Sequence, residues 1–199
     1  PKDQKEILKA INNPEDLKAG KRDIPFGREI FIERSDFIEN PPKKFFRLGI
    51  GKEVRLRYAY FVKCVEVVKN GNGDILEIKC TYDPKTLGGK APDGRKVKGT
   101  IHWVDCDESI DAEVRLYDRL FSSENPNQKE NFLDALNANS CEVKENAKLE
   151  ISMENPEEKT YQFERNGYFK MDKKLSNKGK NVFIRTVSLR DTWAKIKNK

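Results

Sequence analysis

Apolar and polar residues alternate with a period of two along most of the chain, and the alternating segments are rich in β-branched and aromatic residues. This pattern predicts β-strands, because successive strand side chains point to opposite faces of a sheet. The predicted strands cover residues 28–33, 53–68, 75–82, 96–104, 140–151, 159–172 and 181–193.

Turn and helix signals separate these strands. KNGNGD at 69–74 contains Asn-Gly pairs typical of a tight hairpin turn, and APDGRK at 91–96 predicts a second turn. Helical spacing of Ile7, Leu8 and Ile11 predicts a short helix in the first dozen residues, and residues 124–139 predict another.

Short strands joined by tight turns indicate an all-β barrel or sandwich class. The chain has 199 residues, of which 36% are hydrophobic and 36% charged. This composition limits the core that one unit can build, and it favours two compact barrels over one thick domain. The pair Pro41-Pro42 is the candidate boundary between them.

No apolar run in the sequence approaches the roughly 20 residues that span a bilayer, so a soluble, cytoplasmic protein is expected. The four cysteines, at 64, 80, 106 and 141, form no CxxC pair and have no histidine nearby, so they are interpreted as reduced and structural, with no metal site. The chain begins without methionine, and we expect it to be a fragment of a longer protein.

The net charge of +6 is unevenly distributed. Residues 170–199 hold ten Lys/Arg and two Asp, whereas residues 105–160 hold fifteen Asp/Glu and six Lys/Arg. A basic region beside an acidic one is typical of a nucleic-acid-binding protein, and solvated surface lysines are the alternative.

Motifs with catalytic chemistry are weak. GNGDIL at 71–76 lies between two predicted strands and lacks the helix of a nucleotide-binding loop, and His102 has no partner motif for a triad or a metal site. No catalytic residue is therefore assigned.

The segment PKKFFRLGIGKEVRLRYAY, residues 42–60, interleaves basic and aromatic residues. At a period of two, Arg55 and Arg57 lie on one face, about 7 Å apart, opposite Val54 and Leu56. Guanidinium groups on that face suit phosphates and unpaired bases. A surface strand whose arginines pair with neighbouring acids remains equally open at this point.

Six blocks of the sequence, in order, resemble the C-terminal anticodon-binding region of glutaminyl-tRNA synthetases (glutamine–tRNA ligases). These blocks are PFGREIFIERSDF, LGIGKEVRLRYAY, DGRKVKGTIHWV, VRLYDRLFSSENP, YQFERNGYF and VFIRTVSLRDTWAK. The resemblance covers nearly the whole chain from about residue 12. It implies two tandem six-stranded β-barrels, like a small ribosomal protein that binds 5S rRNA, with a few short helices. The proximal barrel would comprise residues 1–42 and 116–199, and the distal barrel residues 43–115.

The resemblance also implies that the chain binds the anticodon stem-loop of glutamine tRNA, with anticodon CUG or UUG, and holds its bases in separate pockets. Arg55 and Arg57 match arginines at the first base and its phosphates, Arg47 one at the third base, and Gln162 the glutamine that reads the middle uracil. Weaker matches imply tRNA contacts from Lys44, Arg165 and Arg190.

Two positions depart from the family. Lys44 replaces a glutamine near the middle base and would offer a phosphate contact instead, and Ile184 replaces an asparagine and loses its polar contact.

The chain lacks the HIGH-type and KMSKS-type motifs of a class I catalytic domain, and KMDKK at 170–174 lies in a β-rich region. The resemblance therefore implies a fragment that is inactive alone and binds no cofactor. The complete enzyme, expected to be a monomer, would use ATP and Mg²⁺ in its upstream catalytic domain. The alternatives are the equivalent region of a non-bacterial-type glutamyl-tRNA synthetase and an RNA-binding barrel protein with no synthetase parent.

Overall fold

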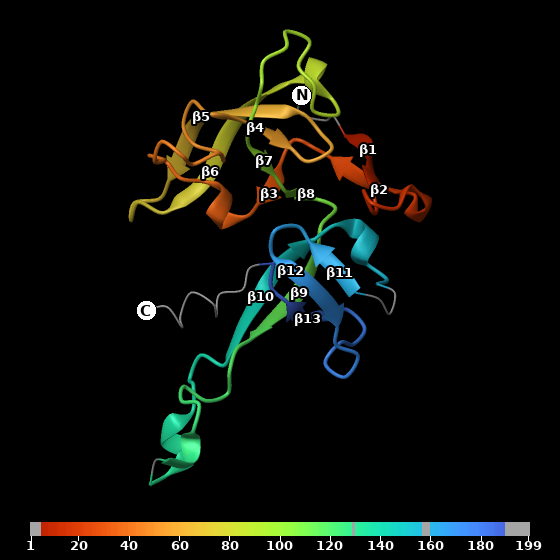
Figure 1. Cartoon of the computed structure of the whole chain (residues 1–199). Coiled ribbons are helices and arrows are strands. Elements are labelled where there is room, and N and C mark those ends of the chain that lie inside the picture. Colours follow the sequence, from red (N-terminus) through yellow and green to blue (C-terminus); the bar gives the residue numbers. More distant parts are fainter. Residues whose placement is uncertain (1–4, 129, 157–159, 190–199) are drawn as a thin grey trace. The chain divides into compact units, whose positions relative to one another are not determined.

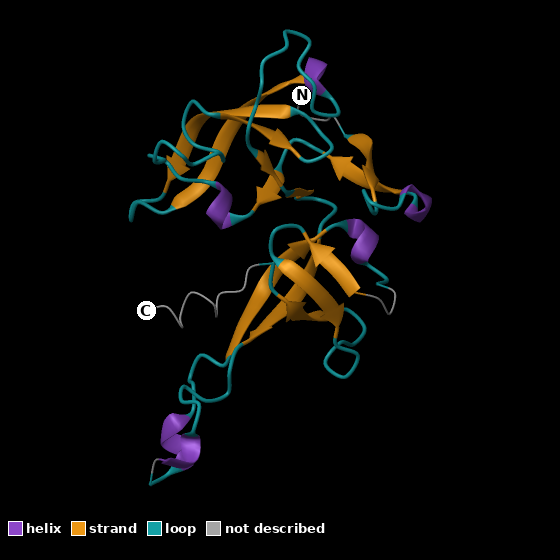
Figure 2. Cartoon of the chain, viewed as in Figure 1, coloured by secondary structure: helices purple, strands orange, loops and turns teal. Residues whose placement is uncertain are grey.

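A computed structural model describes residues 5–128, 130–156 and 160–189 of the chain (Figure 1). It divides into two compact units: unit 1 comprises Pro1–Ser109 with Glu150–Ser152, and unit 2 comprises Ile110–Leu149 with Met153–Lys199. The described residues form thirteen strands and six short 3₁₀ turns, which confirms the all-β class (Figure 2). None of the described helices is long and apolar enough to cross a membrane.

Unit 1 contains three sheets. β1 (Glu6–Ile11) pairs with β2 (Lys21–Phe26), and β3 (Ile30–Ile32) pairs with β8 (Trp103–Asp105), both antiparallel. The third sheet has the order β6-β5-β4-β7. Its strands are β4 (Glu53–Leu56), β5 (Phe61–Lys69), β6 (Ile75–Asp83) and β7 (Thr100–Ile101).

All three sheets of unit 1 share one core, in which Leu8, Ile24 and Phe37 pack together with Leu48 and Val54. Residues before 43 are therefore grouped with residues 43–109, whereas the sequence led us to expect them with residues 116–199. The physical reason is that β1, β2 and β3 bury their apolar faces against the same core as β4 and β5.

Unit 2 is one five-stranded sheet with the order β10-β9-β13-β12-β11. Its strands are β9 (Ile110–Tyr117), β10 (Cys141–Leu149), β11 (Thr160–Phe163), β12 (Gly167–Met171) and β13 (Asn181–Val187). β9 and β13 are parallel, and the other neighbours are antiparallel. The core on one face includes Val114, Phe169 and Phe183.

The predicted N-terminal helix is wrong, because residues 6–11 form the strand β1. Leu8 and Ala10 alternate inward with 6% and 0% exposure, whereas Ile7 points outward at 59%. The helical spacing came from residues that lie on opposite faces of this strand.

The second predicted helix is also wrong, since the described residues of 124–139 form only the 3₁₀ turns η4 (Pro126–Gln128) and η5 (Phe132–Ala135). The remaining 3₁₀ turns are η1 (Leu17–Ala19), η2 (Arg34–Asp36), η3 (Pro84–Thr86) and η6 (Ile151–Met153). By contrast, 69–74 is a hairpin turn as predicted, with Gly73 at φ +88°.

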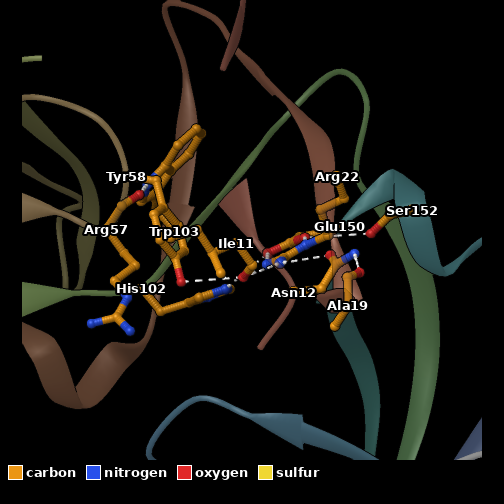
Figure 3. A network of polar contacts seen from close by, with 10 residues as sticks. All are labelled: Ile11, Asn12, Ala19, Arg22, Arg57, Tyr58, His102, Trp103, Glu150 and Ser152. Atoms are coloured by element: carbon orange, nitrogen blue, oxygen red, sulfur yellow. Dashed lines mark hydrogen bonds and ion pairs between the residues drawn. The ribbon is translucent and has the colours of Figure 1, made fainter. Parts of the chain in front are cut away.

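A partly buried ion-pair network lies in unit 1 (Figure 3). The guanidinium of Arg22 on β2 donates to both carboxylate oxygens of Glu150, with Nη2 2.8 Å from Oε1. His102 Nε2 lies 3.4 Å from the same Oε1 atom. Burial alone would raise the pKa of Glu150, but the hydrogen bonds from Arg22 and His102 outweigh it and lower that pKa to about 2.

Candidate nucleic-acid interface

The segment 53–68 is a hairpin rather than the single strand predicted from its alternation. β4 ends at Leu56, and the chain turns through Tyr58, which has φ +63°, before β5 begins at Phe61. Val54 and Leu56 enter the core as expected, with 1% and 0% exposure, but Ala59 is also fully buried. Arg55 therefore lies on a strand and Arg57 in the turn, so they do not share a strand face.

Arg55 is positioned by contacts with an aromatic ring and with the backbone of Gly89. Its Cζ lies 5.5 Å from the centroid of the Phe61 ring, and a Cβ atom on Gly89 would lie 2.6 Å from its Nε. Gly89, at φ +85°, therefore permits the close approach of the guanidinium. The buried Nε of Arg55 has no hydrogen-bond partner among the described residues.

Arg95 lies over the same Phe61 ring, at 5.4 Å, and has a different role. It forms ion pairs with Glu53, Asp83 and Asp93 at 3.0, 2.6 and 2.7 Å. The hydrogen bonds that its guanidinium donates to these three carboxylates raise the pKa of Arg95. Arg55 forms no ion pair within the described part of the chain. Its charge is therefore available to an anionic ligand.

Arg57 lies in the tight turn with its Cζ 5.0 Å from the centroid of the Tyr58 ring. Its carbonyl oxygen accepts a hydrogen bond of 2.9 Å from Trp103 Nε1, and its backbone N–H donates to the Ile101 carbonyl at 3.0 Å. These bonds fix the backbone from which the guanidinium projects.

Arg47 contacts a fully buried carboxylate. Its Nη1 donates to Asp36 Oδ1 at 2.7 Å, and the same nitrogen lies 3.3 Å from the Ser35 carbonyl oxygen. Within the described residues, Nε and Nη2 of Arg47 make no hydrogen bond. Nε and Nη2, the second fork of the guanidinium, therefore remain available to a ligand.

The loop 43–47 lies against the start of β4. Gly99 joins the two, because its carbonyl accepts the backbone N–H of Arg55 at 2.8 Å, while a Cβ atom on Gly99 would lie 2.3 Å from the Phe46 carbonyl oxygen. Phe46 is 54% exposed, and Lys98 Nζ lies 5.3 Å from the centroid of its ring. Lys44 in this loop is exposed.

The sequence pattern identified Phe46 among the aromatic residues interleaved with basic ones, but it did not identify Phe61 or Gly89 as contacts of Arg55, or Lys98 as a contact of Phe46. Of these, Gly89 has a sequence signal in the glycine pair 88–89. Gly89 and Lys98 are far along the chain from the residues that they contact, so spacing could not reveal these contacts.

The other predicted contacts lie in unit 2 or beyond the described residues. Gln162 is exposed on β11, between Tyr161 and Phe163, which pack against the core. Arg165 lies in the turn after β11 with φ +64°. Ile184 lies on β13 beside Lys170 and Arg115. Arg190 falls outside the described residues.

A reduction in salt dependence is expected when Arg55 is changed to alanine. Each phosphate contact releases counterions when RNA binds, so the loss of one contact should make the slope of log affinity against log salt concentration less steep by about one unit. The affinity for RNA should also decrease. Titration of an anticodon stem-loop at several salt concentrations measures both quantities. Arg28→Ala, at an exposed arginine between β2 and β3, is the matched control and should leave the slope unchanged. An unchanged slope for Arg55→Ala would mean that this arginine makes no contact with an RNA phosphate.

The sheets and arginines described above define an all-β protein with a surface suited to an anionic ligand. Two family models, both described as "tRNA synthetases class I (E and Q), anti-codon binding domain", match residues 1–83 and 100–172. The chain belongs to this family of class I synthetase anticodon-binding domains.

Its relatives include proteins named glutamine–tRNA ligase from three bacteria. The chain is 56% identical over 196 residues to that of Bradyrhizobium diazoefficiens, 53% over 192 to that of Proteus mirabilis and 47% over 202 to that of Clostridium kluyveri. These alignments cover 98%, 96% and 100% of this chain. The chain spans about a third of each relative's length, at 35%, 34% and 36%.

Proposed function

We propose that this chain is the anticodon-binding region of a glutamine–tRNA ligase and that it recognises the anticodons CUG and UUG of glutamine tRNA. The observation that carries the proposal is identity of 47–56% to glutamine–tRNA ligases over nearly the whole chain. The unpaired Arg55 charge, backed by an aromatic ring, supports it physically.

Each base of the anticodon is assigned to separate residues. Arg55 and Arg57 bind the first base and its phosphates, and the free fork of Arg47 binds the third base, a guanine. Gln162 reads the middle uracil, because an exposed amide both donates to and accepts from the edge of a base. Lys44, Arg165 and Arg190 add contacts to the RNA backbone.

The complete protein, in this proposal, attaches glutamine to tRNA in the cytoplasm with ATP and Mg²⁺. Its catalytic domain would correspond to the part of the relatives' sequences that this chain does not span. The chain itself contributes RNA recognition.

Glutamate anticodons differ from glutamine anticodons only at the third base, which is cytosine instead of guanine. The chain should therefore bind a CUG stem-loop more tightly than a CUC stem-loop, which separates the glutaminyl from the glutamyl assignment. Equal binding of all anticodon variants would support an RNA-binding barrel without anticodon selectivity and would overturn the proposal.

Gln162→Ala should relax selectivity at the middle base. The expected loss is about 1–3 kcal/mol of discrimination between uracil and the other bases, because the amide hydrogen bonds are removed. The measurement is a competition assay with stem-loops altered only at this base. Gln128→Ala, at an exposed glutamine in η4, is the control and should retain full discrimination. Retained discrimination in Gln162→Ala would remove this residue from the site.

A further inference from the structure

The outward face of the sheet in unit 2 carries an exposed tyrosine directly beside Gln162. In the β11–β12 pair, Gln162 lies opposite Tyr168, and both side chains are exposed, Tyr168 at 40%. Their neighbours Tyr161, Phe163 and Phe169 point to the other face and pack in the core.

Core packing fixes this orientation. The rings of Phe163 and Phe169 stack with centroids 4.4 Å apart, and Tyr161 meets Phe183 edge to face at 6.3 Å. Since strand side chains alternate, inward placement of these rings forces Gln162 and Tyr168 outward. Directly opposed residues on antiparallel strands have Cβ atoms about 4.5–5.5 Å apart, so the amide and the phenol ring are adjacent.

Charge around this pair favours an anionic ligand on one side. Lys170, two residues from Tyr168 on the same face of β12, is exposed and has no ion pair within the described residues. Farther across the sheet, Glu113 offsets part of the positive charge, because it pairs with Arg115 at 2.6 Å and with Lys180 at 2.7 Å. Those hydrogen bonds, from Lys180 and then Arg115, lower the pKa of Glu113.

We propose that Tyr168 is the stacking surface for the middle anticodon base, whose edge Gln162 reads. An exposed aromatic ring on a sheet is a common platform for an unstacked RNA base, and it binds the face of the base while a neighbouring amide binds its edge. Lys170 lies where it contacts the adjoining phosphate. This inference rests on the proposed function and adds a binding residue to it.

Tyr168→Ala should weaken binding of a CUG stem-loop by about 5-fold to about 150-fold, the range for losing one base–aromatic stack. Tyr168→Phe retains the ring and should bind as the wild type does. Tyr117→Ala is the matched control, since Tyr117 is 49% exposed on β9, which lies three strands from β11. It should leave the affinity unchanged.

A stem-loop lacking the middle base isolates the contact. On this abasic RNA, wild type and Tyr168→Ala should bind equally, because the ring has no base to stack on; a loss as large as on intact RNA would overturn the proposal. 2-Aminopurine at the middle position should lose fluorescence on binding wild type and not on binding Tyr168→Leu, which preserves apolar bulk. Equal quenching by both proteins would also overturn it.

The outcomes separate the two proposals. If the wild-type chain does not distinguish CUG from altered anticodons, the proposed function fails whatever Tyr168 does. If it does distinguish them and Tyr168→Ala binds the intact stem-loop as wild type does, only the stacking role fails.

Discussion

Glu150→Gln should lower the free energy of unfolding of unit 1 by about 3 kcal/mol at pH 7, because it removes the charge that holds the guanidinium of Arg22. The side chains of Arg22 and Glu150 are 28% and 15% exposed, so solvent screens this ion pair only in part. Denaturant titration followed by Trp103 fluorescence, in a background where Trp193 is phenylalanine, reports on unit 1.

The same ion pair predicts a pH dependence. The pKa of Glu150 is depressed from 4.5 to about 2 in the folded protein, so the carboxylate stabilises the fold fully above about pH 4.5. That contribution is lost as the pH falls from 4.5 towards 2. The difference in stability between wild type and Glu150→Gln should therefore shrink across this window.

Glu66→Gln provides the control for Glu150 within the same unit, since Glu66 pairs with Lys79 on the surface with side chains 57% and 45% exposed. It should leave the stability of unit 1 close to that of the wild type, because a pair this exposed contributes little. If Glu150→Gln costs no more than Glu66→Gln, the ion pair of Arg22 and Glu150 does not stabilise unit 1.

Arg47→Ala should destabilise unit 1 by about 3 kcal/mol and abolish preference for guanine at the third base. The stability loss follows from the carboxylate of Asp36, which is 0% exposed and loses its ion pair. The loss of preference for guanine follows because the variant lacks Nε and Nη2 of Arg47, which bind the third base in the proposed function. Chemical denaturation and stem-loop competition measure the two effects separately.

A double variant distinguishes these roles of Arg47. Asp36→Asn combined with Arg47→Ala removes the buried charge, so it should recover part of the stability but none of the third-base selectivity. Recovery of both would mean that Arg47 acts on RNA binding only by supporting the fold. Asp36→Asn alone should retain selectivity, since the fork of Arg47 is still present.

The hairpin at 53–69 shows how far the sequence pattern reached. Alternation identified Val54 and Leu56 as core positions, and both are buried. It missed the turn, because no glycine or proline interrupts residues 53–68 and the positive φ falls on Tyr58. Such a turn is stabilised by tertiary contacts such as the Trp103 hydrogen bond to Arg57, which local pattern does not encode.

The candidate site divides in the same way. Motif resemblance indicated Arg47, Arg55, Arg57 and Gln162, but it did not show whether each side chain is buried, exposed or ion-paired. Arg55 and Arg95 both lie over the ring of Phe61, but they differ in charge pairing. Carboxylates from three separate segments pair with Arg95 and not with Arg55.

By itself, the sequence determined the all-β class, many of the strand segments, the hairpin turn at 69–74 and the family, since alternation, turn residues and motif order are local properties of the chain. Only the tertiary structure decided that β1 is a strand, that residues before 43 join the core of residues 43–109, and that Tyr168 stands beside Gln162. Pairing partners, burial and charge neutralisation all depend on residues far apart in the sequence, and folding alone brings them together.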